Sequence, residues 1–273
     1  MKSNIELLRA YFKKKTRVII AFSGGVDSGL LLYLAHKTLG VENVLAVIVD
    51  TDFTFTKETD EAIRFCKDNS IRYKKIQVDF SHRQDILENS PSRCYLCKQT
   101  MFAPIIDIKE QRGYEAVVEG TNADDLSDFR PGMRATEELG VEKPYLLFGI
   151  GKKYIRHLAS LYKLPFARKP AMCCAATRII YGERISVSKL NMIRAAEHFL
   201  RDELGIEQVR VRFSKYMAII ETDEKGRRNV LKHRLEIVAA VRRLGFQRVL
   251  FDLEGYKKAG KREINEKKTA GLV

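Results

Sequence analysis

The segment Val18–Ser28, with the sequence VIIAFSGGVDS, determines how the rest of this chain is interpreted. Its first five residues form an apolar run that is typical of a short strand buried on both faces. Two glycines interrupt the run, and the residues from Asp27 to Lys37 then read as a helix that ends near Gly40. A strand, a glycine turn and a helix in this order predict a loop whose backbone N–H groups bind an anion at the positive end of the helix.

The side chains of this loop favour pyrophosphate as the anion. Gly24 and Gly25 let the backbone approach a phosphate without a side-chain clash, and Ser23 and Ser28 add hydroxyl donors. Asp27 would repel bare phosphate, so we expect it to bind a Mg²⁺ ion that bridges to pyrophosphate. The loop lacks the Gly-Lys-Ser/Thr ending of a Walker A motif, and it is not a GxGxxG loop. The alternative is a tight turn in which Asp27 and Ser28 only cap the helix.

Strands and helices continue to alternate beyond this loop. The alternation predicts an α/β fold, an open parallel sheet with helices on both faces, and a cysteine-bearing loop after the third strand. The expected strands are Val18–Phe22, Val44–Val49, Ile71–Val78, Ala116–Glu119 and Tyr145–Phe148, and the expected helices are Asp27–Lys37, Thr56–Asn69, Met101–Gln111 and Lys152–Tyr162.

The pattern changes at about Ser186, which predicts a smaller C-terminal α+β domain with helices on one face of a small sheet. We place the boundary so that the first domain covers residues 1–183 and the second covers residues 184–273. The elements expected in the second domain are the helices Ser188–Leu204 and Leu231–Leu244 and the strands Val209–Phe213, Ala218–Glu221 and Val249–Leu253.

The charge of the chain indicates anionic partners. Its 273 residues have a formal net charge of +14, which favours nucleotides, phosphorylated small molecules or RNA, unless the high lysine content marks no site at all. No stretch approaches the roughly 20 consecutive apolar residues of a membrane span. The charged N-terminus lacks the apolar region of a signal peptide, so we expect a cytoplasmic protein without a membrane partner.

A second polar loop follows the fourth expected strand. A loop at the carboxyl end of a strand is where an open α/β sheet binds its ligand. Its amide and acids can orient Mg²⁺ or ribose, and its arginine can contact phosphate, although turn-forming residues of this kind also make ordinary polar connections. We assign to nucleotide binding Gly120, Thr121, Asn122, Asp125 and Arg130.

The five cysteines are an odd number, and four of them are clustered. Cys94 and Cys97 form a CxxC motif, and Cys173 and Cys174 are adjacent. Three thiolates can hold a 4Fe–4S cluster by three irons and leave the fourth iron open. Four thiolates can instead bind zinc. Buried cysteines can also act as small hydrophobic residues, which suits Cys66 and one residue of the adjacent pair.

Two arginines and two acids stand out in the C-terminal part. Arg210 and Arg212 alternate along an expected strand and so share one face, an arrangement that suits a phosphate. The alternative is the exposed polar face of an edge strand. Glu197 and Glu221 could serve a metal or phosphate site.

The loop SGGVDS resembles that of the N-type ATP-pyrophosphatases, the PP-loop superfamily with an adenine nucleotide alpha hydrolase-like fold. That likeness implies that ATP is cleaved between its α- and β-phosphates and that AMP is transferred to a substrate. Members include GMP synthetase, NAD synthetase and tRNA thiolases. The combination of SGGVDS, EGTNADD–RPG and KPA–C–TR–YG, which spans nearly the whole chain, resembles the LarE family of ATP-dependent sulfur transferases in nickel-pincer cofactor biosynthesis.

The likeness to this family implies a reaction and its residues. ATP and Mg²⁺ would adenylate a carboxylate of pyridinium-3,5-biscarboxylate mononucleotide, with Asp27 and Ser28 in catalytic positions, and sulfur would then displace AMP. Cys174 matches the cysteine that is sacrificed in single-cysteine members. Cys94 and Cys97 resemble the branch in which three cysteines hold a 4Fe–4S cluster whose open iron can carry an extra sulfide.

Two questions stay open at this point. Either Cys173 or Cys174 can be the third ligand, and the sulfur can come from cluster-bound sulfide, another donor or a sacrificed cysteine. The likeness also implies a homo-oligomer, with the C-terminal domain in substrate binding and oligomerisation. It implies that Arg210 and Arg212 lie near the substrate phosphate, and we assign Arg178 with them to cofactor binding. The competing hypotheses are a tRNA thiolase, for which we find no separate RNA-binding module, and a nucleotide-binding regulator with a structural metal site.

Overall fold

The computed structural model describes residues 3–127, 131–169 and 173–256, and its contacts divide the chain into two compact units. Unit 1 comprises Met1–Asp79 and Cys94–Met172, and unit 2 comprises Phe80–Arg93 and Cys173–Val273. This division differs from a boundary between residues 183 and 184. Within unit 2, the backbone N–H of Ile185 donates to the Leu87 carbonyl at 2.8 Å, which ties the early segment to the later one.

Unit 1 is built on a four-stranded sheet in the order β3-β2-β1-β4, and every pairing in it is parallel. This confirms the α/β fold predicted from the sequence. Because the strands are parallel, their carboxyl ends meet at one edge of the sheet. The strands are β1 (Val18–Ala21), β2 (Val44–Thr51), β3 (Arg72–Val78) and β4 (Ala116–Val118).

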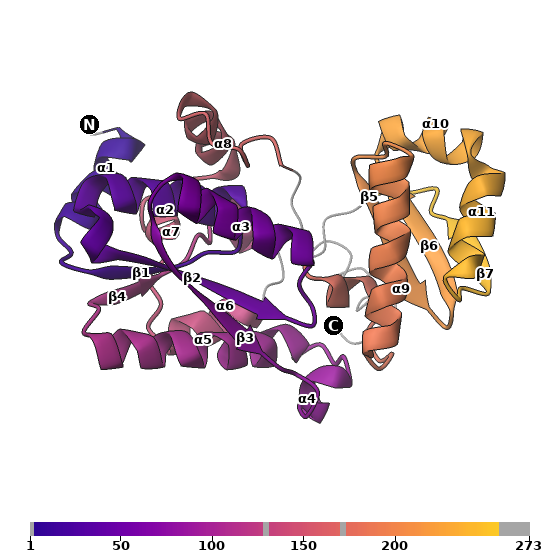
Figure 1. Cartoon of the computed structure of the whole chain (residues 1–273), viewed down its shortest axis with the longest axis horizontal. Helices are drawn as coiled ribbons and strands as arrows, with labels where there is room; N and C mark the ends of the chain where they lie inside the picture. Colours follow the sequence, from indigo (N-terminus) through magenta and orange to yellow (C-terminus); the bar gives the residue numbers. More distant parts are fainter. Residues whose placement is uncertain (1–2, 128–130, 170–172, 257–273) are drawn as a thin grey trace. The chain divides into compact units, whose positions relative to one another are not determined.

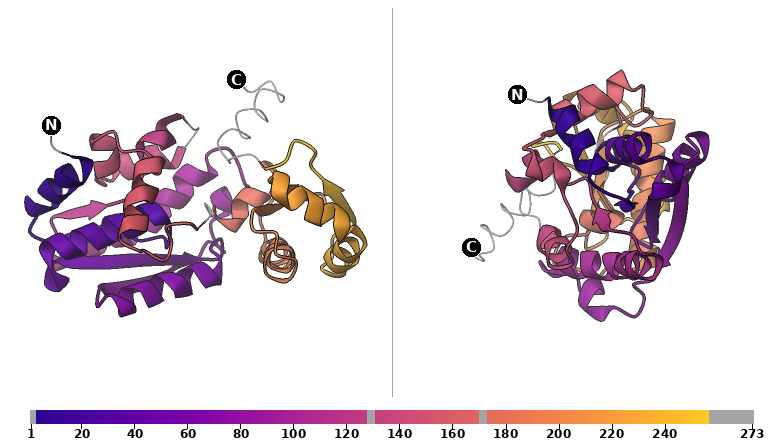
Figure 2. Two further views of the ribbon diagram at one scale, coloured as in Figure 1. Left: turned by 90° about the horizontal axis from the view of Figure 1, so that it is seen from above. Right: turned by 90° about the vertical axis from the view of Figure 1, so that its left-hand side faces the viewer.

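The helices of unit 1 cover both faces of this sheet. Figure 1 shows α2 and α3 on one side of the sheet and α5 on the other, and the views in Figure 2 show the same layers from other directions. The helices are α1 (Asn4–Lys13), α2 (Val26–Leu39), α3 (Thr56–Asp68), α5 (Arg93–Arg112, which begins at the last residue of the early unit 2 segment), α6 (Pro131–Glu138), α7 (Pro144–Leu147) and α8 (Lys152–Leu161).

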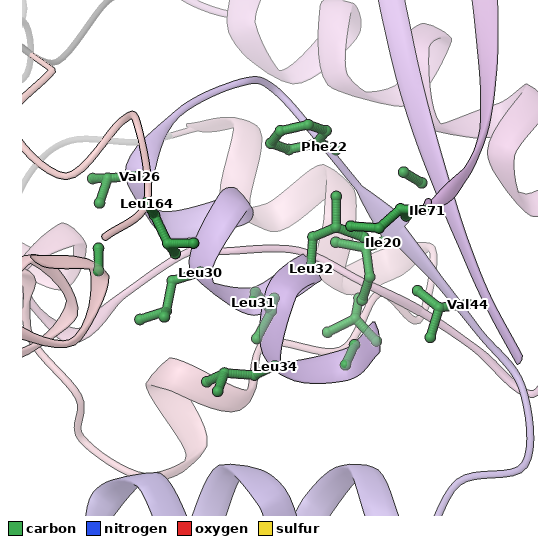
Figure 3. Close-up of a cluster of buried hydrophobic side chains, with 14 of the residues drawn as sticks. Ile20, Phe22, Val26, Leu30, Leu31, Leu32, Leu34, Val44, Ile71 and Leu164 are labelled. Carbon is green, nitrogen blue, oxygen red and sulfur yellow. The ribbon is translucent and has the colours of Figure 1, made fainter. Parts of the chain in front are cut away.

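Alternation of side chains along the strands explains why both faces are buried. Ile19, Val47 and Val117 pack with apolar residues of α5 in one cluster. Their neighbours along the strands, among them Ile20, join α2, α3 and α8 in a second cluster, where Leu31 and Leu32 lie close to Ile20 (Figure 3). The two clusters hold β1 and β4 in place, and the loops that carry the candidate site begin at the carboxyl ends of these two strands.

Two sequence expectations for unit 1 are wrong. Residues 145–148 are not a fifth strand, because Pro144 occupies the first turn of α7, a position that its fixed φ suits. The chain meets the sheet slightly earlier, where Glu142 forms an isolated parallel bridge with Val118. The CxxC motif is not in a loop either, since α5 begins at Arg93 and includes both cysteines.

Unit 2 contains the smaller sheet, in the order β5-β6-β7. The first two expected strands pair with each other in antiparallel fashion, and the last strand is parallel to β6. A single helix over residues 231–244 is wrong: there are two helices, and Asp223 caps the first by accepting a hydrogen bond from Gly226 N–H at 2.9 Å. The elements are α4 (Gln84–Leu87), α9 (Val187–His198), a π-helical turn (Phe199–Glu203), β5 (Val209–Ser214), β6 (Met217–Thr222), α10 (Glu224–Lys232), α11 (Arg234–Arg243) and β7 (Arg248–Phe251).

Among the described residues, no helix combines the length and the apolar content that crossing a membrane requires.

Candidate active site

The predicted phosphate loop lies between the end of β1 and the start of α2. Gly24 adopts the left-handed φ of +72°, and Gly25 is the residue that precedes the helix. The Ser23 N–H donates to Ser28 Oγ at 3.2 Å, and the two serine hydroxyls lie 3.0 Å apart. Backbone N–H groups and hydroxyls therefore meet at the N-terminus of a 14-residue helix, as an anion site requires.

The loop after β4 presses directly against this phosphate loop. A Cβ at Gly120 would lie 2.7 Å from the backbone nitrogen of Ser28 and 2.9 Å from the carbonyl carbon of Asp27. A Cβ at Gly24 would lie 3.1 Å from the Glu58 carbonyl oxygen. Both glycines are thus required by close backbone approach, and the two loops predicted to bind nucleotide form one surface of unit 1.

A buried tyrosine supports the loop. Tyr145 on α7 is fully buried, and its hydroxyl donates to the backbone carbonyl of Asp27 at 3.1 Å. Burial, with the nearby Asp27 charge, raises the pKa of Tyr145 well above its ordinary value, so the hydroxyl keeps its proton and remains a donor. The sequence analysis missed this residue because it placed the segment in a strand.

The carboxylate of Asp27 lies among several charged groups. It forms an ion pair with Lys152 at the start of α8, and Asn122 Nδ2 lies 3.5 Å from its other oxygen. Burial raises the pKa of Asp27, and the charge of Asp125 raises it further, while Lys152 and Arg156 act in the opposite direction. The net shift of the Asp27 pKa is upward, so the effect of burial outweighs that of the two nearby cations.

The second loop is held by its own polar groups. The N–H of Asn122 donates to Asp125 Oδ2, and the N–H of Asp124 donates to Asn122 Oδ1, both at 3.0 Å. Asp124 in turn accepts the backbone N–H of Lys152 at 2.8 Å. Asn122 and Asp125 thus shape the loop beside Asp27, and Arg130 lies outside the described residues.

The strand that carries this loop is also linked to the CxxC motif. Glu119, which follows β4, is buried and forms a 3.1 Å ion pair with Lys98, the residue after Cys97. It also accepts hydrogen bonds from Thr121 at 3.0 Å and Thr136 at 2.8 Å. Burial alone would raise the pKa of Glu119, but Lys98 and the two threonines lower it below its ordinary value.

Cys94 and Cys97 lie in the first turn of α5. Residues three apart in a helix share one face, about 5–6 Å apart at their Cβ atoms, so both thiols can reach a common ligand. The Cys97 thiol lies 3.5 Å from the Met101 sulfur. Within unit 1, the Lys98–Glu119 ion pair connects the start of α5, which carries both cysteines, with the loop after β4.

The adjacent cysteines belong to unit 2, where they precede the 3₁₀ helix η3 (Ala175–Arg178). Arg178 is fully buried and donates to the carbonyls of Cys173 and Cys174 at 2.5 and 3.0 Å. Its guanidinium also binds both oxygens of Glu197, at 2.9 and 3.2 Å. Burial alone would lower the pKa of Arg178, but Glu197 raises it. Arg178 therefore fixes the backbone on which both thiols are carried.

The two arginines of β5 are buried, only 2 % and 5 % exposed, so the exposed edge-strand alternative is wrong. Arg212 binds Glu221 Oε2 at 2.9 and 3.1 Å and the Thr177 carbonyl at 2.8 Å. Burial lowers the pKa of Arg210, and the neighbouring charge of Arg178 lowers it further. Its guanidinium lies over the Tyr256 ring, 5.3 Å from the centroid.

A fourth buried arginine was not predicted. Arg93 Nη1 donates to the Ala176 carbonyl at 3.2 Å and to the side chain of Asn89, and its guanidinium lies over the Tyr181 ring. Asn89, in the left-handed region, donates to the Ile180 carbonyl at 2.7 Å. Its place next to the CxxC motif is the only signal in the sequence that could have singled out Arg93.

Unit 2 therefore buries more positive than negative charge. Its buried described residues include four arginines, Arg93, Arg178, Arg210 and Arg212, and two glutamates, Glu197 and Glu221. Buried charges are costly unless they are balanced. Guanidinium groups are suited to phosphate and carboxylate ligands.

Comparison with known proteins places the chain in a family. The family model described as NAD synthase matches residues 1–92, the part with the phosphate loop. An uncharacterized protein of Synechocystis sp. is 35 % identical over 94 % of this chain and 96 % of its own length, and one of Methanocaldococcus jannaschii is 35 % identical over 92 % and 94 %. The pyridinium-3,5-bisthiocarboxylic acid mononucleotide synthase of Lactiplantibacillus plantarum is 32 % identical over 92 % of this chain and 90 % of its own length. The chain belongs to the LarE family. It is an ATP-dependent sulfur transferase.

The phosphate loop of this LarE-family chain fits Mg²⁺ and ATP. Its backbone N–H groups and serine hydroxyls lie at the N-terminus of α2, and the half-buried carboxylate of Asp27 lies in the first turn of the same helix. Carboxylate and amide oxygens of Asp27, Asn122 and Asp125 are the hard ligands that Mg²⁺ prefers.

The cysteines of this LarE-family chain are of the ligand type that holds a 4Fe–4S cluster. Cys94 and Cys97 share a helix face, as two ligands of one group must. Within the described ranges no three His, Cys, Asp or Glu side chains are gathered as a metal site. Glu197 and Glu221, which were considered for a metal, are engaged by arginines instead.

Proposed function

We propose that this enzyme adenylates a carboxylate of a pyridinium dicarboxylate mononucleotide and converts it to a thiocarboxylate. The name of the L. plantarum relative states the product of such a reaction. The observation that carries the proposal is the close packing of the Gly120 loop on Asp27 and Ser28, at the N-terminus of α2 where we propose that pyrophosphate binds. A free carboxylate has no viable leaving group, so activation by ATP must come before sulfur enters.

Each loop residue would have a defined part in adenylation. The N–H groups and hydroxyls of residues 23–28 would hold the β- and γ-phosphates, and Asp27 with Asn122 and Asp125 would hold Mg²⁺, which supplies charge neutralisation when bound. The carboxylate oxygen of the substrate attacks the α-phosphorus, the bond to pyrophosphate breaks, and an acyl-adenylate forms. Donors fixed in advance stabilise the charge that develops on the phosphoryl oxygens.

The buried arginines of unit 2 would bind the other end of the substrate. Arg178, Arg210 and Arg212 are held by glutamates or backbone carbonyls, so their positions are set before a ligand arrives. We propose that they take the phosphate of the mononucleotide, with Glu197 and Glu221 holding the arginines in place and not binding a metal. The C-terminal α+β part would thus serve substrate binding, and the implied homo-oligomer remains a proposal.

For the sulfur we propose a 4Fe–4S cluster held by Cys94, Cys97 and Cys174. The residues supporting this are the shared helix face of the CxxC motif and the sequence likeness of Cys174 to the family cysteine. The group would supply a sulfide at its open iron when bound. Sulfur then attacks the carbonyl carbon of the acyl-adenylate, the bond to the AMP oxygen breaks, and the thiocarboxylate is released.

Anaerobic purification with iron and sulfide analysis tests the sulfur source. We expect about four irons per chain, lost in Cys94→Ala, in Cys97→Ala and in only one of Cys173→Ala and Cys174→Ala. Cys66→Ala is the matched control, because burial raises the pKa of the Cys66 thiol to about 12 and keeps it protonated. A protein without iron that loses one cysteine sulfur per turnover would overturn the cluster and favour a sacrificed cysteine.

Two other outcomes would redirect the function. Specific, salt-resistant binding of tRNA would favour a tRNA thiolase. Nucleotide binding without any pyrophosphate release on addition of the dicarboxylate mononucleotide would favour a regulator.

A further inference from the structure

The position of Lys152 is not explained by the fold alone. Its ammonium forms an ion pair with Asp27, while its own backbone N–H donates to Asp124 Oδ2 at 2.8 Å. The residue before it, Gly151, lies so close to Asp124 that a Cβ there would be 2.9 Å from Oδ1. The start of α8 is therefore anchored to the loop after β4 by its backbone, independently of the contact that the Lys152 side chain makes with Asp27.

Charged groups of both signs act on the Asp27 carboxylate. The groups that act on its carboxylate are Lys152 and Arg156, which are positive, and Asp125, which is negative. Arg156 is committed to the backbone, since it donates to the carbonyls of Ala167 and Lys169 at 2.7 and 2.8 Å. Lys152, whose side chain is 29 % exposed, is the cation that can move.

A divalent cation at Asp27 would disturb this arrangement. Two cations cannot share one carboxylate at close range without strong mutual repulsion. The ammonium is carried on a flexible four-carbon stem, so it can leave Asp27 while the backbone of α8 stays in place. The strongest anion then available beside the metal is the phosphate chain of ATP.

We propose that Lys152 is a placeholder cation and a phosphate-binding residue. Without nucleotide it neutralises Asp27 in the position of the metal. When Mg²⁺ and ATP bind, Asp27 would hold the metal and the Lys152 ammonium would move to oxygens of the β- and γ-phosphates, the part of ATP that later leaves as pyrophosphate. This inference rests on the proposed adenylation, and it adds Lys152 to the residues that touch the reacting nucleotide.

The test is a pair of binding measurements on Lys152→Gln that move in opposite directions. The variant should bind Mg²⁺-ATP about tenfold more weakly or worse, as expected when a charge-assisted hydrogen bond to phosphate is lost. It should bind Mn²⁺ alone, measured by electron paramagnetic resonance, more tightly than the unchanged protein, because Asp27 no longer has an occupant. A merely structural lysine would weaken both or neither.

Controls separate this inference from the proposed function. Lys153→Gln removes an exposed lysine at the next position and should change neither affinity. Asp27→Asn in the Lys152→Gln background should abolish the gain in Mn²⁺ affinity, and this holds even if the single variant is less stable. If the unchanged protein binds Mg²⁺-ATP but Lys152→Gln shows the same affinities, the placeholder is overturned alone. If the unchanged protein binds no Mg²⁺-ATP, the adenylation proposal fails first.

Discussion

Gly120 shows how a single residue can decide whether the candidate site forms. A Cβ at this position would lie 2.7 Å from the Ser28 nitrogen, a distance that backbone atoms cannot relieve without moving the phosphate loop. Gly120→Ala should therefore cost about 1–3 kcal/mol of stability by overpacking. It should also lower the affinity for Mg²⁺-ATP by about tenfold or more, the effect of roughly 1.4 kcal/mol. Thermal unfolding and calorimetric titration measure the two effects.

Gly113→Ala is the matched control for this prediction. Gly113 has a left-handed φ of +64° but no atom within 4 Å of a built Cβ. The change should cost about 1 kcal/mol or more through backbone strain and leave ATP affinity unchanged. Equal loss of ATP affinity in both variants would mean that the effect at Gly120 is only a loss of stability.

Tyr145 offers a finer test at the same scale. Tyr145→Phe removes the hydrogen bond to the Asp27 carbonyl and should destabilise the protein by about 1 kcal/mol while weakening ATP binding. Tyr114→Phe is the comparison, since the Tyr114 hydroxyl is buried and finds no hydrogen-bond partner among the residues that the structure describes. That change should be neutral or stabilising and without effect on ATP. Identical behaviour of the two variants would argue against support of the loop by Tyr145.

At the scale of elements, the sequence predicted best where the signal is periodic. The strands around β1 and the helices α2, α3 and α8 follow apolar patterns that a buried parallel sheet enforces. The segment 145–148 is too short and apolar for a pattern to tell strand from helix, and Pro144 decided in favour of α7. The part of α5 that precedes Met101 was missed because Cys94 and Cys97 were interpreted as loop residues.

Sequence reasoning identified those residues of the candidate site that belong to short continuous motifs. The phosphate loop and the Gly120 loop are continuous in sequence, so their composition indicated their chemistry. Lys98, Lys152 and Arg93 act through partners that are distant in the chain, such as Glu119 and Asp27, and no spacing rule connects them. The burial of Arg210 and Arg212 was likewise not readable, because alternation shows a shared face but not what covers it.

The buried ion pairs Arg178–Glu197, between η3 and α9, and Arg212–Glu221, between β5 and β6, make unit 2 sensitive to acid. Burial alone would raise the pKa of Glu197, but Arg178 and then Arg210 lower it below its ordinary value. A lowered folded-state pKa contributes stability above the pKa of the unfolded chain, and this contribution is lost as the pH falls through the folded value. Glu197→Gln should therefore cost about 3 kcal/mol at pH 7, with a difference that shrinks below about pH 4.

Denaturant unfolding of both proteins between pH 3 and 7 measures this difference. Glu207→Gln, on an exposed side chain whose nearest lysine nitrogen lies 3.9 Å away, should have almost no effect at any pH. A Glu197→Gln cost that stays constant down to pH 3 would contradict the assigned role of the ion pair.

At the scale of the whole molecule, the proposed function needs two reactions in order, adenylation of a carboxylate and then transfer of sulfur. Unit 1 carries the nucleotide loop and the CxxC helix and connects them through Glu119 and Lys98. Unit 2 carries the buried arginines and the segment with Cys173 and Cys174.

The central claim is that AMP leaves from an activated carboxylate, and isotope transfer tests it most directly. The dicarboxylate mononucleotide labelled with ¹⁸O in its carboxylates is incubated with ATP, Mg²⁺ and anaerobically purified enzyme, and AMP is analysed by mass spectrometry. Because the carboxylate oxygen attacks the α-phosphorus and the carbon–oxygen bond breaks when sulfur enters, each AMP should carry one ¹⁸O. AMP without the label, or ADP in place of AMP, would contradict the account.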